Sequence, residues 1–206
     1  NVTVFDRSDV GSQCSYGNCG KICPSHALPL AEPGVIAQVA RSLFGGNTPF
    51  FMTPKISLIF WRWFLQFLGE CRHNRMITNG RSAYALLARS RELYEDLIGG
   101  CSLDCEWERK GNLYVFQREK SFTQNRKKFE ILKKDFGLEI ESISGSELRS
   151  LEPTLKEGLG GGYYSSSDAN LRPDRLLASW WSNLAQRGVR VIERTEILGL
   201  RFHQGR

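Results

Sequence analysis

The sequence has no run of apolar residues long enough to cross a membrane. Its longest apolar stretch, residues 56–68, is interrupted by Arg62 and Gln66 and is shorter than the about 20 residues that a spanning helix needs. No basic segment followed by an apolar one stands near residue 1, so no signal peptide is expected. The chain also does not begin with Met. We therefore expect no membrane-spanning helix, and we expect the chain to be an internal segment of a longer protein.

Histidine is scarce, which limits the metal sites that the six cysteines could form. Cys14, Cys19 and Cys23 have C-x4-C-x3-C spacing, which differs from the spacing of plant-type iron–sulfur ligands. Cys101 and Cys105 have no histidine nearby at zinc-finger spacing. We predict no metal site, and we expect reduced, buried or half-buried thiols, as is usual for proteins of the cytoplasm.

Acidic residues are fewer than basic ones, and the formal net charge is +6. A positive charge favours anionic partners such as lipid head groups, nucleic acids or a phosphorylated cofactor. The densest basic cluster falls within residues 126–134, on an expected helix, where such charges usually mark a face in contact with solvent. Aromatic residues do not alternate with basic ones as they would in a strip that stacks bases. We predict no nucleic-acid partner.

Helix-like and strand-like segments alternate along the chain, which predicts an α/β or α+β fold. Gly99-Gly100 is expected to end the third helix, and residues 109–112 to form the tight turn of a hairpin. Ser144-Gly-Ser-Glu147 matches a capping box before a short helix that ends ahead of Pro153. The other expected helices are 35–44, 55–70, 82–98, 120–136 and 173–187, the expected strands are 2–5, 103–107, 113–116, 139–143, 160–165, 189–192 and 196–202, and residues 8–34 form an irregular loop.

One part of a dinucleotide-binding motif is present near residue 1. Such a motif has a strand, a glycine-rich turn that opens a helix, and a second strand that ends in an acidic residue. Val2-Thr-Val-Phe-Asp6 matches the second strand with its acid, which would bind ribose hydroxyl groups. The glycine-rich turn would lie about 20 residues earlier, outside the chain. A strand that ends in Asp is common, so this segment alone indicates the motif weakly.

The residues after Asp6 make the pattern specific. Residues 6–34 read Asp-Arg, then Cys-Ser-Tyr-Gly-Asn-Cys-Gly-Lys-Ile, then a proline-rich stretch that ends in Pro-Gly. Further motifs follow in order, namely Trp-Arg-Trp at 61–63, Arg-Lys-Gly-Asn-Leu-Tyr-Val-Phe at 109–116, Leu-Glu-Pro-Thr-Leu at 151–155 and Gly-Gly-Gly-Tyr-Tyr at 160–164. In order and spacing, the chain resembles the small-subunit family of D-amino-acid dehydrogenases, within the D-amino-acid oxidase-like flavoproteins, over essentially its whole length.

This resemblance implies FAD as the cofactor and a truncated fold, in which a Rossmann-like FAD-binding domain is interleaved with an antiparallel-sheet substrate domain. The implied division is a partial FAD-binding domain over 1–45, mainly the substrate domain with a helical insertion over 46–165, and a return to the FAD-binding domain over 166–206. The implied FAD contacts are Asp6 and Arg7 at the adenosine ribose, Ser15, Asn18 and Gly20 at the pyrophosphate and isoalloxazine, and the segment of Ile197 at the adenine.

The implied reaction is oxidative deamination of a small-molecule amino acid, expected to be a D-amino acid. Hydride passes from the substrate Cα to flavin N5, and water then releases a keto acid and ammonia, so the flavin carries the hard step. Tyr163, Tyr164 and Arg172 are the candidates for binding the substrate carboxylate. Each of them also fits an ordinary role, as a tyrosine that packs in a sheet or an arginine at a helix start. No catalytic residue is identified.

The resemblance further implies a quinone as electron acceptor. The aromatic segment around Trp61-Arg-Trp63 then fits a peripheral contact with the inner face of a bacterial plasma membrane, and it fits a packed core helix equally well. The segment by itself is expected to be inactive, because the glycine-rich turn and the rest of the flavin-binding domain lie outside it.

Two other functions fit the sequence. A glycine, sarcosine or hydroxyproline oxidase of the same superfamily would use oxygen, and the sequence does not separate this alternative, because the choice of acceptor depends on access to the flavin. A non-catalytic, membrane-associated or binding module would explain the basic charge without any cofactor.

Overall fold

The computed structural model describes residues 2–43 and 57–201, and the statements below refer to these residues. They form two compact units, each assembled from segments that are separated in the sequence. Unit 1 contains residues 1–22, 91–111 and 168–206, and unit 2 contains residues 23–90 and 112–167. The interleaved mixture of helices and strands confirms the fold class predicted from the sequence. The expected domain boundary at 45/46 lies outside the described residues.

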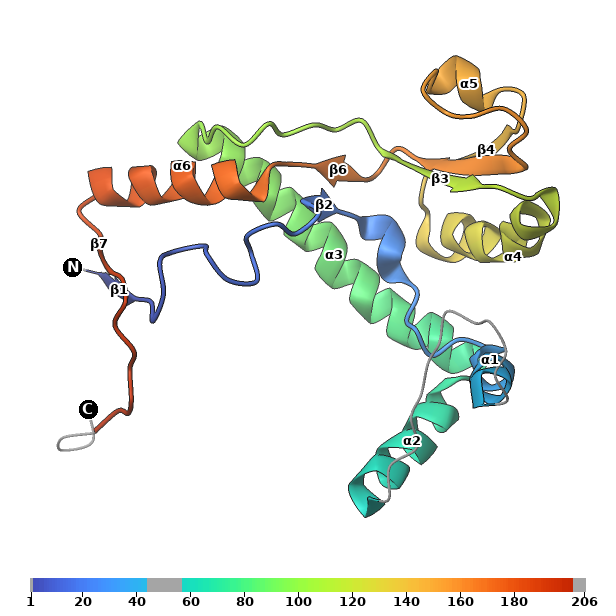
Figure 1. Cartoon of the computed structure of the whole chain (residues 1–206), viewed down its shortest axis with the longest axis horizontal. Coiled ribbons are helices and arrows are strands. Elements are labelled where there is room, and N and C mark those ends of the chain that lie inside the picture. The colour runs from blue at the N-terminus through green and yellow to red at the C-terminus, as the bar shows by residue number, and fades with distance from the viewer. Residues whose placement is uncertain (1, 44–56, 202–206) are drawn as a thin grey trace. The chain divides into compact units, whose positions relative to one another are not determined.

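Unit 1 is built on a short parallel pair of strands, β1 (Thr3–Phe5) and β7 (Arg190–Ile192). Parallel neighbours require a long connection between them, and here the helix α6 (Pro173–Gln186) leads directly into β7 (Figure 1). Proline suits the first turn of α6, where a missing N–H costs nothing. Apolar side chains of α6 face the strands across a shallow groove that is lined by Val4, Val10, Leu177, Trp180, Trp181, Leu184 and Val191.

A second strand pair lies in the same unit. β2 (Lys21–Ile22) runs antiparallel to β6 (Ala169–Asn170), and a small core of Leu103, Cys105, Leu171 and Leu176 packs beside them. Burial of these four side chains joins two segments that are far apart in the sequence, and Ile22 of the first segment packs against them.

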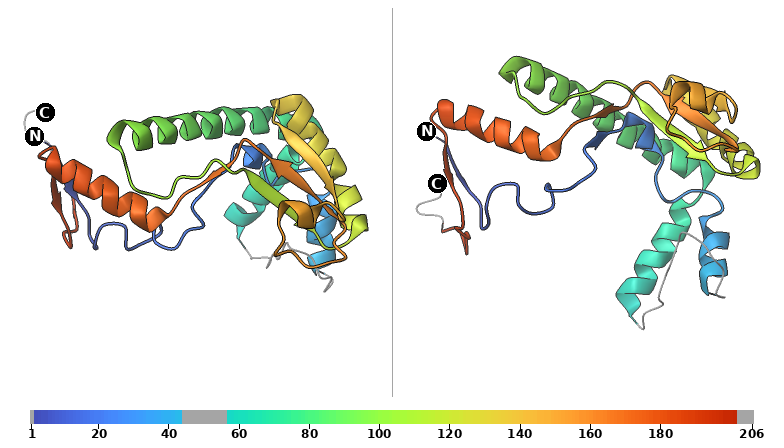
Figure 2. Two further views of the ribbon diagram at one scale, coloured as in Figure 1. Left: turned by 90° about the horizontal axis from the view of Figure 1, so that it is seen from above. Right: turned by 45° about the horizontal axis from the view of Figure 1, so that its top comes forward.

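Unit 2 is built on a three-stranded antiparallel sheet in the order β3-β5-β4. Its strands are β3 (Asn112–Phe116), β5 (Gly161–Ser165) and β4 (Ile140–Ser144). The helix α4 (Glu119–Phe136) lies along one face of this sheet (Figure 2) and buries Phe129, Leu132 and Phe136. α4 ends where predicted, because Gly137 adopts the left-handed conformation, with φ of 68°.

Five further helices lie in the described part of the chain. They are η1 (Pro24–Ala27), α1 (Val35–Leu43), α2 (Leu58–Glu70), α3 (His73–Cys101) and α5 (Leu148–Leu151). Ser57 caps α2, since its hydroxyl accepts a hydrogen bond from the Phe60 N–H. None of the helices in the described part of the chain has the length and apolar character needed to span a membrane.

The third helix is longer than predicted. α3 begins at His73 and continues through Gly99-Gly100 to Cys101. Glycine costs a helix about 1 kcal/mol relative to alanine, but Leu97, Ile98 and Cys101 pack against the core of unit 1. Tertiary packing therefore outweighs the local signal that should have ended the helix.

The predicted hairpin between 103–107 and 113–116 was wrong. Residues 103–107 form no strand, and β3 pairs with β5 instead. A single bridge joins Glu108 to Asn170. The strand expected at 196–202 is likewise absent over residues 196–201, and residue 202 lies outside the described part.

Two smaller expectations also need correction. Glu147 accepts a hydrogen bond from the Ser144 N–H at 3.1 Å, but α5 begins only at Leu148, so the pair closes a turn before the helix. All six thiols are free, yet Cys14 and Cys19 are exposed rather than buried.

Candidate functional site

Polar groups gather where β1 and β7 end. Ligands of parallel sheets bind outside the carboxyl ends of the strands. The two segments remain paired beyond the strands, because the Asp6 N–H donates to the Ile192 carbonyl at 3.0 Å and the Thr195 N–H donates to the Asp6 carbonyl at 2.8 Å. This pairing fixes the backbone on both sides of the edge.

Asp6 is half-buried at this edge. Its Oδ1 accepts a hydrogen bond from the Ser8 N–H at 2.8 Å, while its Oδ2 has no hydrogen-bond partner among the described residues. A carboxylate with one oxygen fixed and one open can accept hydrogen bonds from ribose hydroxyl groups. Arg7 is exposed beside it and forms no ion pair within the described residues, and Ile197 is exposed further along the chain.

Glu193 is a residue of this edge that the sequence reasoning missed. Its Oε1 accepts a hydrogen bond from the Val10 N–H at 2.8 Å, and the next residue, Arg194, donates to Asp9 Oδ1 at 2.8 Å. The two contacts hold residues 8–10 against the end of β7. The signal was available, because Glu193 follows a strand directly, as Asp6 does.

Ser15, Asn18 and Gly20 lie on the exposed loop that leads into β2. The Asn18 side chain is used within the loop, since Nδ2 donates to the Ser15 carbonyl at 3.0 Å and Oδ1 accepts from the Gly20 N–H at 2.7 Å. Gly20 itself is buried, and its backbone packs against Leu171. The protein's own packing therefore already requires glycine at position 20, and a contact of this loop with a flavin stays a prediction.

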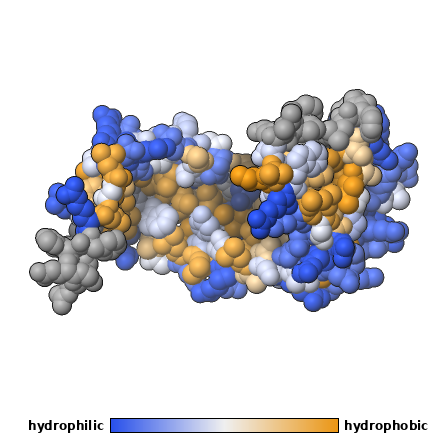
Figure 3. Space-filling view, turned by 90° about the horizontal axis from the view of Figure 1, so that it is seen from below, coloured by the Kyte–Doolittle hydropathy of each residue, from blue (hydrophilic) through white to orange (hydrophobic). Residues whose placement is uncertain are grey.

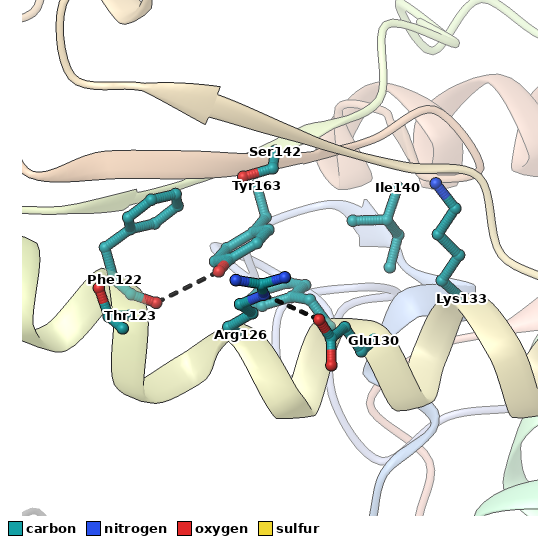
Figure 4. Close-up of a pocket in the computed structure, with 9 residues that line it drawn as sticks. Phe122, Thr123, Arg126, Glu130, Lys133, Ile140, Ser142 and Tyr163 are labelled. Atoms are coloured by element: carbon teal, nitrogen blue, oxygen red, sulfur yellow. Dashed lines mark hydrogen bonds and ion pairs between the residues drawn. The ribbon is translucent and has the colours of Figure 1, made fainter.

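Tyr163 lies in the core of unit 2, on the face of β5 that α4 covers. Its ring stacks on Phe129 with centroids 4.0 Å apart, and its hydroxyl donates to the Phe122 carbonyl at 3.2 Å. Burial raises the pKa of this hydroxyl. A cavity of about 340 Å³ lies beside the ring (Figure 4), with the Arg126–Glu130 ion pair at its rim.

Tyr164 faces the other side of the sheet, because neighbouring residues of a strand point to opposite faces. It is half-buried and lies opposite Leu113 of β3 and Glu141 of β4. A single ligand on either face of this sheet can therefore meet one of the two tyrosines but not both.

Arg172 is the residue before α6, in unit 1. Its guanidinium donates to Asp174 at 2.6 Å and lies 3.7 Å from Glu106. The hydrogen bond from Arg172 lowers the pKa of the Asp174 carboxyl below its ordinary value. Both acids already balance the charge of this arginine, so a substrate carboxylate would have to compete with them.

The described part of the chain contains no set of side chains that could bind a metal ion. No group of three or more histidine, cysteine, aspartate or glutamate side chains there could hold a metal ion.

Comparison with known proteins identifies the family to which the whole chain belongs. The model of a family described as FAD dependent oxidoreductase matches residues 1–206. A D-amino acid dehydrogenase of Granulibacter bethesdensis is 29% identical over 156 residues, which cover 75% of this chain and 37% of that protein. A D-amino acid dehydrogenase of Neisseria meningitidis is 25% identical over 98% of this chain and 50% of its own length. The chain thus spans half or less of these curated relatives.

Solved structures show the same fold. A glycine oxidase from Geobacillus kaustophilus matches with a TM-score of 0.58 and 18% identity, over 97% of this chain and 42% of its own. An L-amino acid deaminase from Proteus vulgaris matches with a TM-score of 0.60 and 13% identity, over 100% of this chain and 41% of its own. At these identities the likeness concerns the fold alone.

Proposed function

Because the chain belongs to the family of FAD-dependent oxidoreductases, we propose that it is part of an enzyme that oxidises D-amino acids to keto acids and ammonia. One observation carries the structural side of this proposal. Asp6, at the carboxyl end of a parallel strand pair, has an open carboxylate oxygen at the place where a nucleotide needs a hydrogen-bond acceptor. The substrate class follows from the relatives, which are D-amino acid dehydrogenases.

The chemistry of this edge fits the adenosine half of FAD. We assign to Asp6 the acceptance of hydrogen bonds from the ribose hydroxyl groups, and to the exposed guanidinium of Arg7 the neutralisation of nearby phosphate charge. The backbone around Ile197 would meet the adenine. Glu193 acts as a positioning residue, because it fixes the loop that follows Asp6 and Arg7.

The loop of Ser15, Asn18 and Gly20 is assigned to the pyrophosphate and isoalloxazine. Asn18 would hold the loop in shape through its two internal hydrogen bonds, which leaves the exposed Ser15 as the side chain available for direct contact. When bound, FAD accepts the hydride that leaves the substrate Cα, so the protein needs only to position the substrate and tune the local charge.

Tyr164 is the tyrosine that we assign to the substrate. Its neighbour Tyr163 has its hydroxyl hydrogen-bonded inside the core, whereas Tyr164 lies on the face of the sheet away from α4. A phenol at that position can donate a hydrogen bond to a substrate carboxylate. Arg172 remains a weaker candidate for the same carboxylate, because Asp174 and Glu106 already pair with it.

We further propose a quinone as the electron acceptor. The relatives named above are dehydrogenases, and a lipid-soluble acceptor would bring the whole protein to the surface of a bacterial plasma membrane. The exposed apolar residues of α2 are consistent with such a peripheral contact.

An anaerobic absorbance titration of the full-length protein that contains this chain tests the reaction. Flavin bands at about 450 nm should bleach when D-amino acids are added, and the matched L-amino acids serve as control. Reoxidation by a soluble quinone analogue but not by oxygen would support the proposed acceptor.

Other outcomes would replace the proposal. Bleaching by glycine, sarcosine or hydroxyproline together with fast reoxidation by oxygen would indicate an oxidase of the same family. A protein that stays colourless after incubation with FAD would overturn the enzymatic function and leave a non-catalytic binding module.

A further inference from the structure

α2 exposes an unusual amount of apolar surface. None of its residues is buried, and the exposed fractions of Leu58, Ile59 and Leu65 are 91%, 83% and 66%. Trp61 and Trp63 are 44% and 54% exposed. Contiguous apolar surface of this kind marks a site of interaction rather than a face that meets water.

The exposed side chains follow the turns of the helix. Leu58, Trp61 and Leu65 have i, i+3, i+7 spacing and share one side, while Ile59 and Trp63 have i, i+4 spacing and share another. Arg62 and Gln66 are the polar residues between the two stripes. An arginine can place its apolar stem along such a surface and keep its charged end in contact with polar groups.

Positive charge predominates in α2 and the first part of α3. Residues 57–90 contain five arginines and one acidic residue, Glu70, whose carboxylate already accepts a hydrogen bond from Asn79 at 2.8 Å. Arg72 and Arg75 line a hollow of about 500 Å³ where α2 passes into α3, together with His73, Asn74 and Thr78. Neither arginine forms an ion pair with a described residue, so their charges are not compensated within this part of the chain.

We propose that α2 and this arginine hollow dock on the surface of an anionic phospholipid bilayer. Tryptophan is enriched where a protein meets the membrane–water interface, and basic residues are attracted to anionic leaflets. A helix of 13 residues is about 20 Å long and therefore lies on a bilayer rather than across it. Leucine and tryptophan enter the boundary between head groups and acyl chains, while Arg72 and Arg75 contact lipid phosphates. Figure 3, coloured by the hydropathy of each residue, shows hydrophobic residues beside hydrophilic ones at the surface.

This inference deepens the peripheral membrane contact proposed above, but its test does not depend on the reaction. The full-length protein is sedimented with vesicles of phosphatidylcholine alone or of phosphatidylcholine with phosphatidylglycerol, and flavin reduction is measured separately. Binding is expected to the phosphatidylglycerol vesicles and to weaken at high salt, because salt screens the arginine–phosphate attraction. Flavin reduction by D-amino acids without vesicle binding would overturn the membrane docking alone. Vesicle binding without flavin reduction would overturn the proposed reaction alone.

Two variants with matched controls identify the surface. Exchange of Leu58, Trp61 and Leu65 for Gln should lower binding at least about 10-fold, whereas Leu86→Gln, at an equally exposed leucine of α3, should not. The double variant Arg72→Gln/Arg75→Gln should lose about 30-fold in binding to anionic vesicles. The double variant Lys127→Gln/Lys134→Gln removes the same charge from α4 and should bind as the unchanged protein does.

Three results would contradict the proposal. The first is equal binding by the α2 variants and their controls. The second is a change from dimer to monomer in the α2 variants without vesicle binding by the unchanged protein, which would show that a second copy covers the helix. The third is protection of Trp61 and Trp63 from an aqueous quencher in the absence of vesicles, which would show that the remainder of the full-length protein covers it.

Discussion

The carbonyl oxygen of Leu171 lies where a side chain at position 20 would have to be, since a Cβ added to Gly20 would be 1.9 Å from it. The Leu171 N–H also donates to the Gly20 carbonyl at 2.9 Å, and Gly20 has φ of 60°. Only glycine combines this backbone conformation with so close an approach. The loop of Ser15 and Asn18 is thereby anchored at the segment that precedes α6.

Replacement of Gly20 by alanine should therefore destabilise the protein. We expect Gly20→Ala to lower the free energy of unfolding by about 2–3 kcal/mol, from a strained φ together with displacement of the Leu171 carbonyl. Gly17→Ala is the control, because Gly17 also has a positive φ but no atom within 4 Å of an added Cβ; its cost should be about 1 kcal/mol. Equal losses in urea unfolding would show that the contact with Leu171 has no effect.

The two adjacent tyrosines should behave differently. Tyr163→Phe removes the hydrogen bond to the Phe122 carbonyl and should cost about 1 kcal/mol of stability, with an unchanged KM for D-amino acids. Tyr164→Phe should raise the KM for D-amino acids. Steady-state kinetics and thermal unfolding of the full-length variants separate these outcomes, and a KM effect in Tyr163→Phe would reverse the assignment.

The carboxylate of Asp6 should contribute to FAD affinity. Asp6→Asn keeps an oxygen that can accept from the Ser8 N–H but loses the charge, which makes hydrogen bonds from ribose hydroxyls weaker. We expect the Kd for FAD to rise about 10-fold, as measured by quenching of flavin fluorescence. Asp135→Asn removes the same charge from an exposed aspartate of α4, in unit 2, and should leave the Kd unchanged.

Alanine substitutions at two glycines of α3 should change the free energy of unfolding in opposite directions. Gly99 and Gly100 are helical, and a Cβ added to either meets no other atom within 4 Å. Gly99→Ala should therefore raise the free energy of unfolding by about 1 kcal/mol. Gly80→Ala should lower it, because a Cβ there would be 2.8 Å from the Phe136 ring. Stabilisation by both substitutions would mean that the Phe136 ring moves aside at little cost.

The Arg172–Asp174 pair should make stability depend on pH. The hydrogen bond from Arg172 lowers the folded-state pKa of Asp174 below its unfolded value of about 3.9. The unfolded state therefore binds the proton more tightly, and the stabilisation is present above the unfolded pKa and lost as pH falls through the folded one. The Tm difference between the unchanged protein and Asp174→Asn should shrink from pH 7 to pH 2.5. Asp96→Asn, at an exposed aspartate of α3, should show no such trend.

Local signals predicted several elements well. The final helix begins at Pro173 and stops before Gly188, as the sequence indicated, because proline at a helix start and glycine after its end act within a few residues. The hairpin failed for the opposite reason. β3 pairs with β5 across more than 40 residues. The residues next to a strand do not show which distant strand it pairs with.

The candidate site was predictable to a similar degree. Asp6 stood out because an acid after a strand belongs to a known binding pattern, whereas Glu193 matched the same pattern and was missed. The reason for Gly20 could not have come from the sequence, since it depends on Leu171, which is 151 positions away. Alternation along β5 implied that Tyr163 and Tyr164 face opposite sides, but only the position of α4 decides which of them is buried.

The pairing of β1 with β7 has a consequence for how the protein is made. Residue 3 can find its partner only after residue 190 has left the ribosome, which at about 5–20 residues per second takes roughly 10–40 s. During that time β1 is without β7, while every segment of unit 2 is synthesised before the last segment of unit 1. Unit 2 can therefore fold before unit 1 is complete, and the pairing of β1 with β7 comes late in the synthesis of this part of the chain.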